Sequence, residues 1–379
     1  MKKPQLEKPF EYLTRKDGSN FPAETVKNWY ISRAYILDKL NDTLIGIDSD
    51  SHLHAVVMGD SPLMLSVVRQ LALYAHFANY EETDVYGNPS HRNRTVVTIV
   101  SNRNDIIQAL HAEEYLCNLI DHCKYTIDGQ VTNSDSFIDI ELEIVRDWQP
   151  SSTPDTITIT EKEVISYANT CEAEKIFSID TRKAVLSSRI YNLGVTIENL
   201  PAENIHSTHR YGMAMDSFKY NLLGKTIMPL VDESTWLNNP LKVKGDISNI
   251  FCSDTFEARY RTMIQYCGKN YQHSEHWDDC IEALSKCEHS RWIAERLIMG
   301  YRTPTNAELI RDERTFGDLK KTYRNSLKNN AEDPTHICLC SYAELRRISP
   351  DGLKYDSFMI LAIPVILGKL NKIRNQNIK

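Results

Sequence analysis

The hydrophobic pattern of the first half of the chain alternates between short apolar runs and segments with helical spacing. Residues 55–58 and 95–100 are short runs rich in β-branched and apolar side chains, which is typical of buried strands. Each run is followed by apolar residues three or four positions apart, over 63–73 and 106–119. Two strand–helix units in succession predict a parallel sheet with helices on its faces.

The pattern changes on both sides of these units. A helix is predicted over 26–40, and further strands are predicted at 137–145, 175–180 and 225–231. Beyond Thr255 the strand patterns become sparse and helical spacing dominates. The sequence therefore predicts an α/β fold with a parallel-sheet domain followed by a mainly helical domain. The predicted parts are a helical preamble at 1–50, the sheet domain at 51–250 and the helical domain at 251–379, with a charged, Asn-rich insertion at 303–334.

Composition narrows the classes of function. The 379 residues include 44 Lys and Arg against 51 Asp and Glu, a formal net charge of -7, which opposes general nucleic-acid binding. The longest apolar run, 358–367, is about half the ~20 residues that span a bilayer and contains a proline. Nine cysteines in a chain that starts without an apolar leader lead us to expect a protein of the reducing cytoplasm.

A candidate nucleotide loop follows the first predicted strand. A dinucleotide-binding fingerprint has three glycines in the pattern Gly-x-Gly-x-x-Gly, which allow a tight turn, close approach of pyrophosphate and helix packing. Here Gly59 holds the first position, but Ser61 and Met64 hold the other two, and Asp60 places a negative charge beside the expected phosphate. Binding of pyrophosphate in the usual manner is therefore disfavoured.

The end of the second predicted strand departs from the fingerprint as well. An Asp or Glu there would hold a ribose 2′-hydroxyl, whereas this chain has Ser101 and Arg103, which suit a 2′-phosphate as in NADP sites. This half resembles the TrkA-N class of Rossmann domains. Two interpretations stay open: a cofactor site using Gly59, Ser61, Ser101 and Arg103, in which NAD(P) is the less favoured ligand, or a Rossmann-like scaffold that binds no nucleotide.

The second candidate site lies on a helix predicted from 277 to 300. A stripe ~80° wide on this helix carries two carboxylates among apolar residues, which is costly unless they pair. Its members are Trp277, Ile281, Leu284, Glu288, Trp292, Glu295 and Met299. His289, Arg291 and Arg296 flank the stripe. The pattern indicates either a network of internal ion pairs or a pocket in which an aromatic ring stacks on a base and cations bind phosphate.

Three blocks of this region resemble the RyR domain, the repeat of ryanodine receptors that is also widespread in prokaryotes. They are 288–301 (Glu-His-Ser-Arg-Trp-Ile-Ala-Glu-Arg-Leu-Ile-Met-Gly-Tyr), 336–345 (His-Ile-Cys-Leu-Cys-Ser-Tyr-Ala-Glu-Leu) and 354–364. Ile337 and Ser341 replace prolines of the family pattern, and the insertion at 303–334 is longer than usual. Together with an upstream helix, the resemblance covers about residues 257 to 370.

The resemblance implies a ligand and the residues that contact it. Prokaryotic RyR domains, often found beside Rossmann domains and in anti-phage or other conflict systems, are thought to recognise nucleotide-derived ligands. By that resemblance, and from the stripe, the expected ligand contacts are His289, Arg291, Trp292, Glu295, Arg296, Tyr301, His336 and Tyr342. We therefore expect a non-catalytic sensor that recognises an adenine-type nucleotide or nucleotide-derived signal and forms a homo-oligomer. The alternatives are an NAD(P)-dependent or nucleotide-modifying enzyme and a structural or partner-binding module.

Neither a catalytic nor a metal site stands out. The sequence has no Gly-x-Ser-x-Gly elbow, P-loop or His-Glu-x-x-His motif. Cys267, His276, Cys280 and Cys287 are close in sequence, but no Cys-x-x-Cys pair accompanies them, so we expect packing rather than zinc binding.

Overall fold

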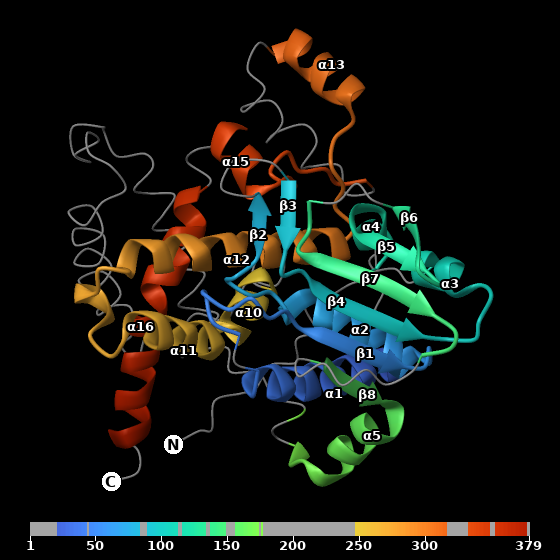
Figure 1. Ribbon diagram of the computed structural model, residues 1–379, viewed down its shortest axis with the longest axis horizontal. Helices are drawn as coiled ribbons and strands as arrows, with labels where there is room; N and C mark the ends of the chain where they lie inside the picture. The colour runs from blue at the N-terminus through green and yellow to red at the C-terminus, as the bar shows by residue number, and fades with distance from the viewer. Residues whose placement is uncertain are drawn as a thin grey trace.

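The computed structural model describes residues 21–43, 45–83, 89–112, 116–133, 137–148, 156–173, 176, 247–316, 333–348 and 353–376. Its central element is a six-stranded sheet with the order β6-β5-β7-β4-β1-β8 (Figure 1). The strands are β1 His54–Met58, β4 Thr95–Val100, β5 Lys124–Ile127, β6 Gln130–Asn133, β7 Ile140–Val145 and β8 Thr156–Thr160. The α/β class is therefore confirmed, with a mixed, mostly parallel sheet.

Five strands are parallel neighbours, and only β6 runs antiparallel, beside β5. The β5–β6 hairpin turns at Asp128 and Gly129, which both have positive φ (45° and 78°), as a tight two-residue hairpin turn requires. The chain passes from β1 to β4 on one side, and β8 lies on the other side of β1. In open α/β sheets, ligands bind outside the carboxyl ends of the strands at such a switch point.

The predictions of 55–58, 95–100 and 137–145 as strands are confirmed by β1, β4 and β7. Those at 175–180 and 225–231 lie outside the described residues, apart from Ile176, which is helical. The β5–β6 hairpin was not predicted. Nor was a second hairpin, β2 Glu81–Thr83 with β3 Pro89–Arg92, in the polar segment before β4.

The helices of the first half cover the sheet. They are α1 Ala23–Asn41, α2 Pro62–Tyr74, α3 Ile106–Ala112, α4 Cys117–His122 and α5 Glu161–Thr170. The prediction at 26–40 is confirmed by α1, whereas the helical segment 106–119 forms two helices, α3 and α4, rather than one. Thr160 and Glu163 cap α5 reciprocally, since each side chain bonds the other's backbone N–H.

The long elements that the structure describes from residue 247 onward are all helices. They are α10 Ile247–Asp254, α11 Phe256–Cys267, α12 Trp277–Ile298, α13 Asn306–Phe316, α15 Tyr342–Ile348 and α16 Leu353–Gln376, with the short 3-10 turn η3 Tyr271–His273. Figure 1 shows α16 crossing α11 and α12. The predicted helix 277–300 is confirmed by α12, and α13 lies within the predicted insertion, of which 317–332 is outside the described residues.

One helix joins the two halves. Ile293, Ala294 and Leu297, in the C-terminal half of α12, belong to the same hydrophobic core as the sheet, and Trp29 of the predicted preamble lies in that core too. The N-terminal half of α12, with Ile281, packs instead with α11 and α16 in a second core. The sheet and the helical part therefore do not pack as separate bodies, because α12 is buried in both cores.

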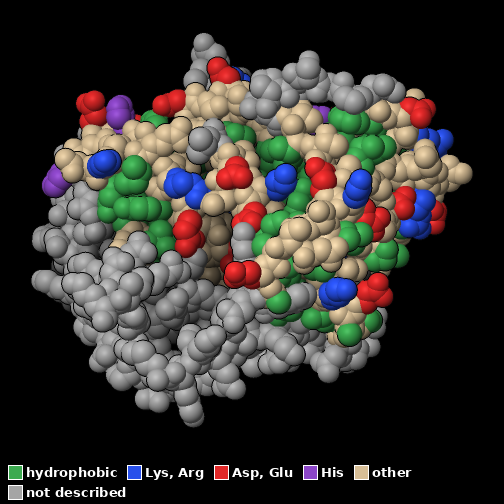
Figure 2. Space-filling view, turned by 90° about the horizontal axis from the view of Figure 1, so that it is seen from below, with side chains coloured by type: hydrophobic (Ala, Val, Ile, Leu, Met, Phe, Trp, Pro, Cys, Tyr) green, Lys and Arg blue, Asp and Glu red, His purple; other side chains and the backbone are tan. Residues whose placement is uncertain are grey.

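The described helices and the charges on one face of the molecule bear on membrane crossing and on binding of a nucleic-acid backbone. Among the described residues no helix is long and apolar enough to cross a bilayer. Figure 2 shows basic and acidic side chains interspersed on the face seen from below. The described part of that face therefore offers a phosphate backbone no continuous cationic track.

Candidate functional site

The loop after β1 is built as a helix cap. Gly59 has φ 117°, a conformation that favours glycine, and its N–H bonds Val100 O at 3.0 Å. Ser61 caps α2, since its Oγ accepts from Met64 N at 3.4 Å, and the same hydroxyl donates to Glu161 Oε1 at 2.7 Å. The positions expected to hold phosphate therefore already have partners within the protein.

Two carboxylates stand at this edge of the sheet. Asp60 accepts a hydrogen bond from Ser101 Oγ, and Glu161 holds Ser61. Arg103, the cation expected to bind a 2′-phosphate, forms two 3.0 Å hydrogen bonds with Asp105 instead. A cavity of about 450 Å³ opens beside Ser61 and Glu161. The cavity is lined by the carboxylates of Glu24 and Glu161 and by one lysine, Lys27, so its charge disfavours the pyrophosphate of a dinucleotide.

The carboxylates of the α12 stripe form a buried ion-pair network. Arg291 Nε and Nη2 donate to Glu288 at 2.9 Å each, and Nη1 donates to Glu295 Oε2 at 2.6 Å. The side chains of Arg291 and Glu295 are only 1% and 0% exposed. The network of internal ion pairs, which was one of the two interpretations of the stripe, is thus present. Arg291 and Glu295 pair with each other and do not line an open pocket.

Arg259 of α11 completes the network from the neighbouring helix. Its Nη1 makes a close ion pair with Glu288 Oε2. Ser248 Oγ of α10 donates to Glu295 Oε2 at 3.0 Å. Burial by itself would raise the pKa of Glu288, but Arg259 and Arg291 outweigh it and lower that pKa to about 2. The ion pairs that Arg259 of α11 and Arg291 of α12 make with Glu288 therefore require that Glu288 is ionised.

This arrangement makes stability depend on acid pH. The carboxyl of Glu288 has an ordinary pKa of 4.5 and a folded pKa of about 2, so its stabilisation is present above 4.5 and is lost as pH falls toward 2. We expect the free energy of unfolding, measured by urea titration, to decline over that range. In Glu288→Gln the slope of the free energy of unfolding against pH should be smaller, by an amount that corresponds to the uptake of up to one proton on unfolding. An unchanged slope in the variant would show that other carboxyls cause it.

Aromatic and cationic side chains gather at the C-terminal end of α12. Trp292 stacks on His289 with ring centroids 5.9 Å apart and meets His336 edge-on at 5.0 Å. The guanidinium of Arg296 lies 5.5 Å from the Trp292 ring and 5.4 Å from the Tyr301 ring. We call Trp292, Arg296, Tyr301 and His336 the Trp292 cluster; all four side chains are partly exposed.

Two further expected residues border this cluster but are held by the protein. His289 places Nε2 3.1 Å from Cys340 O and Nδ1 3.5 Å from Asp356 Oδ2. Burial raises the pKa of Asp356, which its hydrogen bond with His289 partly offsets. Tyr342 meets the His289 ring edge-on at 5.7 Å and is 9% exposed. Both side chains are therefore buried: His289 packs against Trp292 of the cluster, and Tyr342 packs against His289.

Arg302 connects the end of α12 to the segment 333–348 through ion pairs with Glu308 and Asp333, which we call the Arg302 clasp. Its guanidinium bonds Glu308 of α13 at 2.8 and 2.9 Å and Asp333 at 2.6 and 2.8 Å. Its N–H donates to Pro334 O at 3.0 Å, and its carbonyl accepts from His336 N at 3.1 Å. The clasp therefore sets His336 against Trp292. Sequence reasoning missed Arg302, although the capping-box spacing of Thr305 and Glu308 signals the helix that it ties down.

Tyr301 is fixed from the sheet side. Asn118 Nδ2, in α4, donates to Tyr301 O at 2.8 Å. The cluster therefore receives residues from α12 and from the 333–348 segment while its position is set by a helix of the sheet. A group bound on it would contact the junction of the two halves.

Two of the candidates for a metal site lie together, since the side chains of Cys267 and Cys280 form a hydrogen bond. Cys267 Sγ donates to His276 O at 3.6 Å, and Cys280 is fully buried in the second core. Among the described residues, no three His, Cys, Asp or Glu side chains lie together as a metal-binding group. Cys287 Sγ donates to His76 O at 3.2 Å, and burial raises its pKa to about 11.

No protein-family model, no curated protein and no solved structure matches this chain. The resemblance to RyR and TrkA-N domains therefore stays a prediction from the quoted residues, and the function is argued from the site itself.

Proposed function

We propose that the protein is a non-catalytic sensor that binds a nucleotide or nucleotide-derived signal on the Trp292 cluster. The observation that carries the proposal is the convergence of Trp292, Arg296, Tyr301 and His336, from two distant sequence blocks, at one partly exposed place. A purine has a flat π face that stacks on an indole, and phosphate takes the planar fork of an arginine. Stacking falls to Trp292 or Tyr301, and charge neutralisation to Arg296.

Arg291, Glu295 and His289 were expected to contact the ligand, but in this proposal they position the residues that do. Arg291 and Glu295 act from within, because they hold α12 against α10 and α11 under the cluster. His289 orients the Trp292 ring by stacking on it. These three are positioning residues in the proposal, and a link to anti-phage defence rests on the resemblance alone.

The NAD(P)-dependent enzyme is the weaker alternative. Asp60 and Glu161 stand where a pyrophosphate would bind, and Arg103 is already paired with Asp105. Consumption of NAD(P)H that is lost in a Gly59→Val variant would favour that alternative over the sensor.

The test begins with the ligand that the protein itself carries. We would denature the purified full-length chain and identify released small molecules by mass spectrometry, then screen mono-, di- and cyclic nucleotides by thermal shift. Trp292→Ala and Arg296→Ala should each weaken the binding of a stabilising nucleotide by roughly tenfold or more, since each removes ~1–3 kcal/mol of stacking or ionic contact.

Arg146→Ala is the matched control, because Arg146 is an exposed arginine that pairs with Asp128 at the end of β7. It should leave nucleotide binding unchanged. The proposal fails if no nucleotide stabilises the wild-type protein, or if stabilisation survives both cluster variants.

A further prediction concerns the clasp. Arg302→Ala should weaken nucleotide binding while leaving Trp292 in place, because it frees the segment that carries His336. We expect a loss of roughly three- to tenfold, and Arg302→Lys should restore only part of it, since lysine cannot bond two carboxylates bidentately. Isothermal titration calorimetry with the nucleotide that stabilises the wild-type protein measures the affinity of both variants. Equal affinity of Arg302→Ala and wild type would show that the clasp does not position the cluster.

A further inference from the structure

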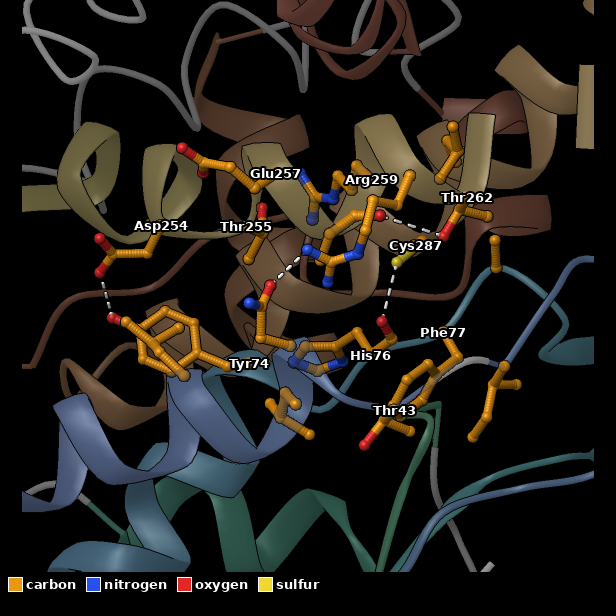
Figure 3. Close-up of a pocket in the computed structure, with 18 of the residues that line it drawn as sticks. Thr43, Tyr74, His76, Phe77, Asp254, Thr255, Glu257, Arg259, Thr262 and Cys287 are labelled. Atoms are coloured by element: carbon orange, nitrogen blue, oxygen red, sulfur yellow. Dashed lines mark hydrogen bonds between the residues drawn. The ribbon is translucent and has the colours of Figure 1, made fainter. Parts of the chain in front are cut away.

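A cavity of about 270 Å³ lies between the end of α2, the end of α1 and helix α11 (Figure 3). Tyr74, His76 and Phe77 line it from one side, and Thr255, Arg259 and Thr262 line it from α11. Leu284 and Cys287 of α12 close it at the back. The cavity touches the middle of α12, whereas the Trp292 cluster lies at the C-terminal end of that helix, and none of the cluster residues lines the cavity.

One wall of the cavity carries guanidinium groups. Arg259 is 4% exposed, so its charge is buried, and its Nη1 side faces Glu288. A guanidinium has five N–H donors, which is more than the ion pair with Glu288 and the contact with Cys287 require, and Arg259 lines the cavity. Arg261, two residues further along α11, also lines the cavity and donates to Asn41 Oδ1. A carboxylate entering the cavity would find a planar donor group.

The lining carries acceptors as well, from α1 and from the α10–α11 side. Asp38 of α1 lines the cavity and accepts from Tyr167 OH at 2.8 Å. Asp254 lines it as well, and bonds Arg33 and Tyr74. The hydroxyl of Thr255 donates to Cys252 O of α10 and that of Thr262 donates to Ala258 O of α11, so the lone pairs of both hydroxyls remain as acceptors. An ammonium group would find carboxylate and hydroxyl oxygens in this lining.

The charges of the lining select the class of ligand. The lining holds the carboxylates Asp38, Asp254 and Glu257 and the guanidinium groups Arg259 and Arg261. Asp254 is also paired with Arg33, and Arg259 with Glu288, so neither sign of charge dominates the lining. A phosphate dianion would meet the carboxylates and a simple amine would meet the guanidinium groups, whereas a molecule with one charge of each sign matches such a lining. A free amino acid is small enough for about 270 Å³.

We propose that this cavity is a second ligand site that binds a small zwitterion of the α-amino-acid class, with its carboxylate toward the guanidinium groups of Arg259 and Arg261 and its ammonium group toward Asp38. The ligand would bridge α1 and the end of α2 to α11, and so would bind across the two cores that α12 joins.

The test uses the full-length protein and the standard L-amino acids as probes. Thermal shift at ~10 mM of each should show a saturable rise in Tm with at least one of them. The N-acetyl and the carboxamide derivatives of that amino acid, which lack one charge each, should bind roughly tenfold or more weakly. Inorganic phosphate should give no rise that the cavity variants abolish.

Two variants locate the effect. Ala258→Leu fills the cavity from α11 with a good helix former and should abolish the response, and Arg261→Gln should weaken it without touching the buried network. Trp292→Ala is the matched control and should retain the response, which separates this site from the nucleotide site. The proposal is overturned if no amino acid stabilises the protein. It is also overturned if both derivatives bind as well as the parent amino acid, or if the response survives in both cavity variants.

Discussion

Replacement of Arg291 by alanine is expected to lower the free energy of unfolding by about 3–5 kcal/mol, because it leaves two buried carboxylates facing each other. Glu288 and Glu295 would lose their shared partner, and only Arg259 would remain beside Glu288. The loss should appear as a lower urea midpoint with an unchanged m-value when unfolding is followed by circular dichroism.

A matched exposed pair gives the control. Arg347 and Glu344 have the same i,i+3 spacing as Arg291 and Glu288, but their side chains are 73% and 40% exposed rather than 1% and 6%. Arg347→Ala should therefore leave the urea midpoint unchanged within error, because water replaces the lost partner. If both alanine variants shifted the midpoint equally, burial would not be the source of the effect.

The second large effect is expected at Asp254, the last residue of α10. Its carboxylate accepts from Arg33 Nε at 2.9 Å and from Tyr74 OH at 2.7 Å, and so connects α1, α2 and α10. Asp254→Ala would leave the Arg33 guanidinium buried without its partner, at a cost of about 3–5 kcal/mol. Differential scanning calorimetry of wild type and variant measures the loss.

Tyr74→Phe separates the ion pair from the hydroxyl. It removes the hydroxyl that donates to Asp254 and keeps the ion pair of Asp254 with Arg33, so we expect a loss of about 1 kcal/mol. Asp254→Ala should therefore be several times more destabilising than Tyr74→Phe. Equal losses would mean that Arg33 finds a new partner or reaches solvent when Asp254 is absent.

The strand and helix predictions that succeeded depend on local pattern. β1, β4 and β7 are apolar on at least one face over their whole length, and α12 keeps helical spacing over 22 residues. The β5–β6 hairpin was missed because its strands are four residues each and partly exposed, so they carry little periodic signal. Its Asp128–Gly129 turn was the available clue.

The sequence predicted which residues of the candidate site lie close together, but not which of them would contact a ligand. The sequence grouped His289, Arg291, Trp292, Glu295 and Arg296 on one helix, and all five are near one another. Whether a charged residue on a helix faces a pocket or another helix depends on what packs there. Arg291 faces Glu288 and Glu295 under α10 and α11, whereas Arg296 reaches the partly exposed ring of Trp292.

The amino-acid sequence by itself determined the α/β class, the first strands of the sheet and the long helix with acids and cations on its stripe, because these follow from periodicity within one element. Only the tertiary structure decided that Arg259 joins Glu288, that His336 meets Trp292 and that the end of α2 and α11 enclose a cavity. Each of these joins residues from different elements, and such contacts are set by how the elements pack rather than by any spacing along the chain.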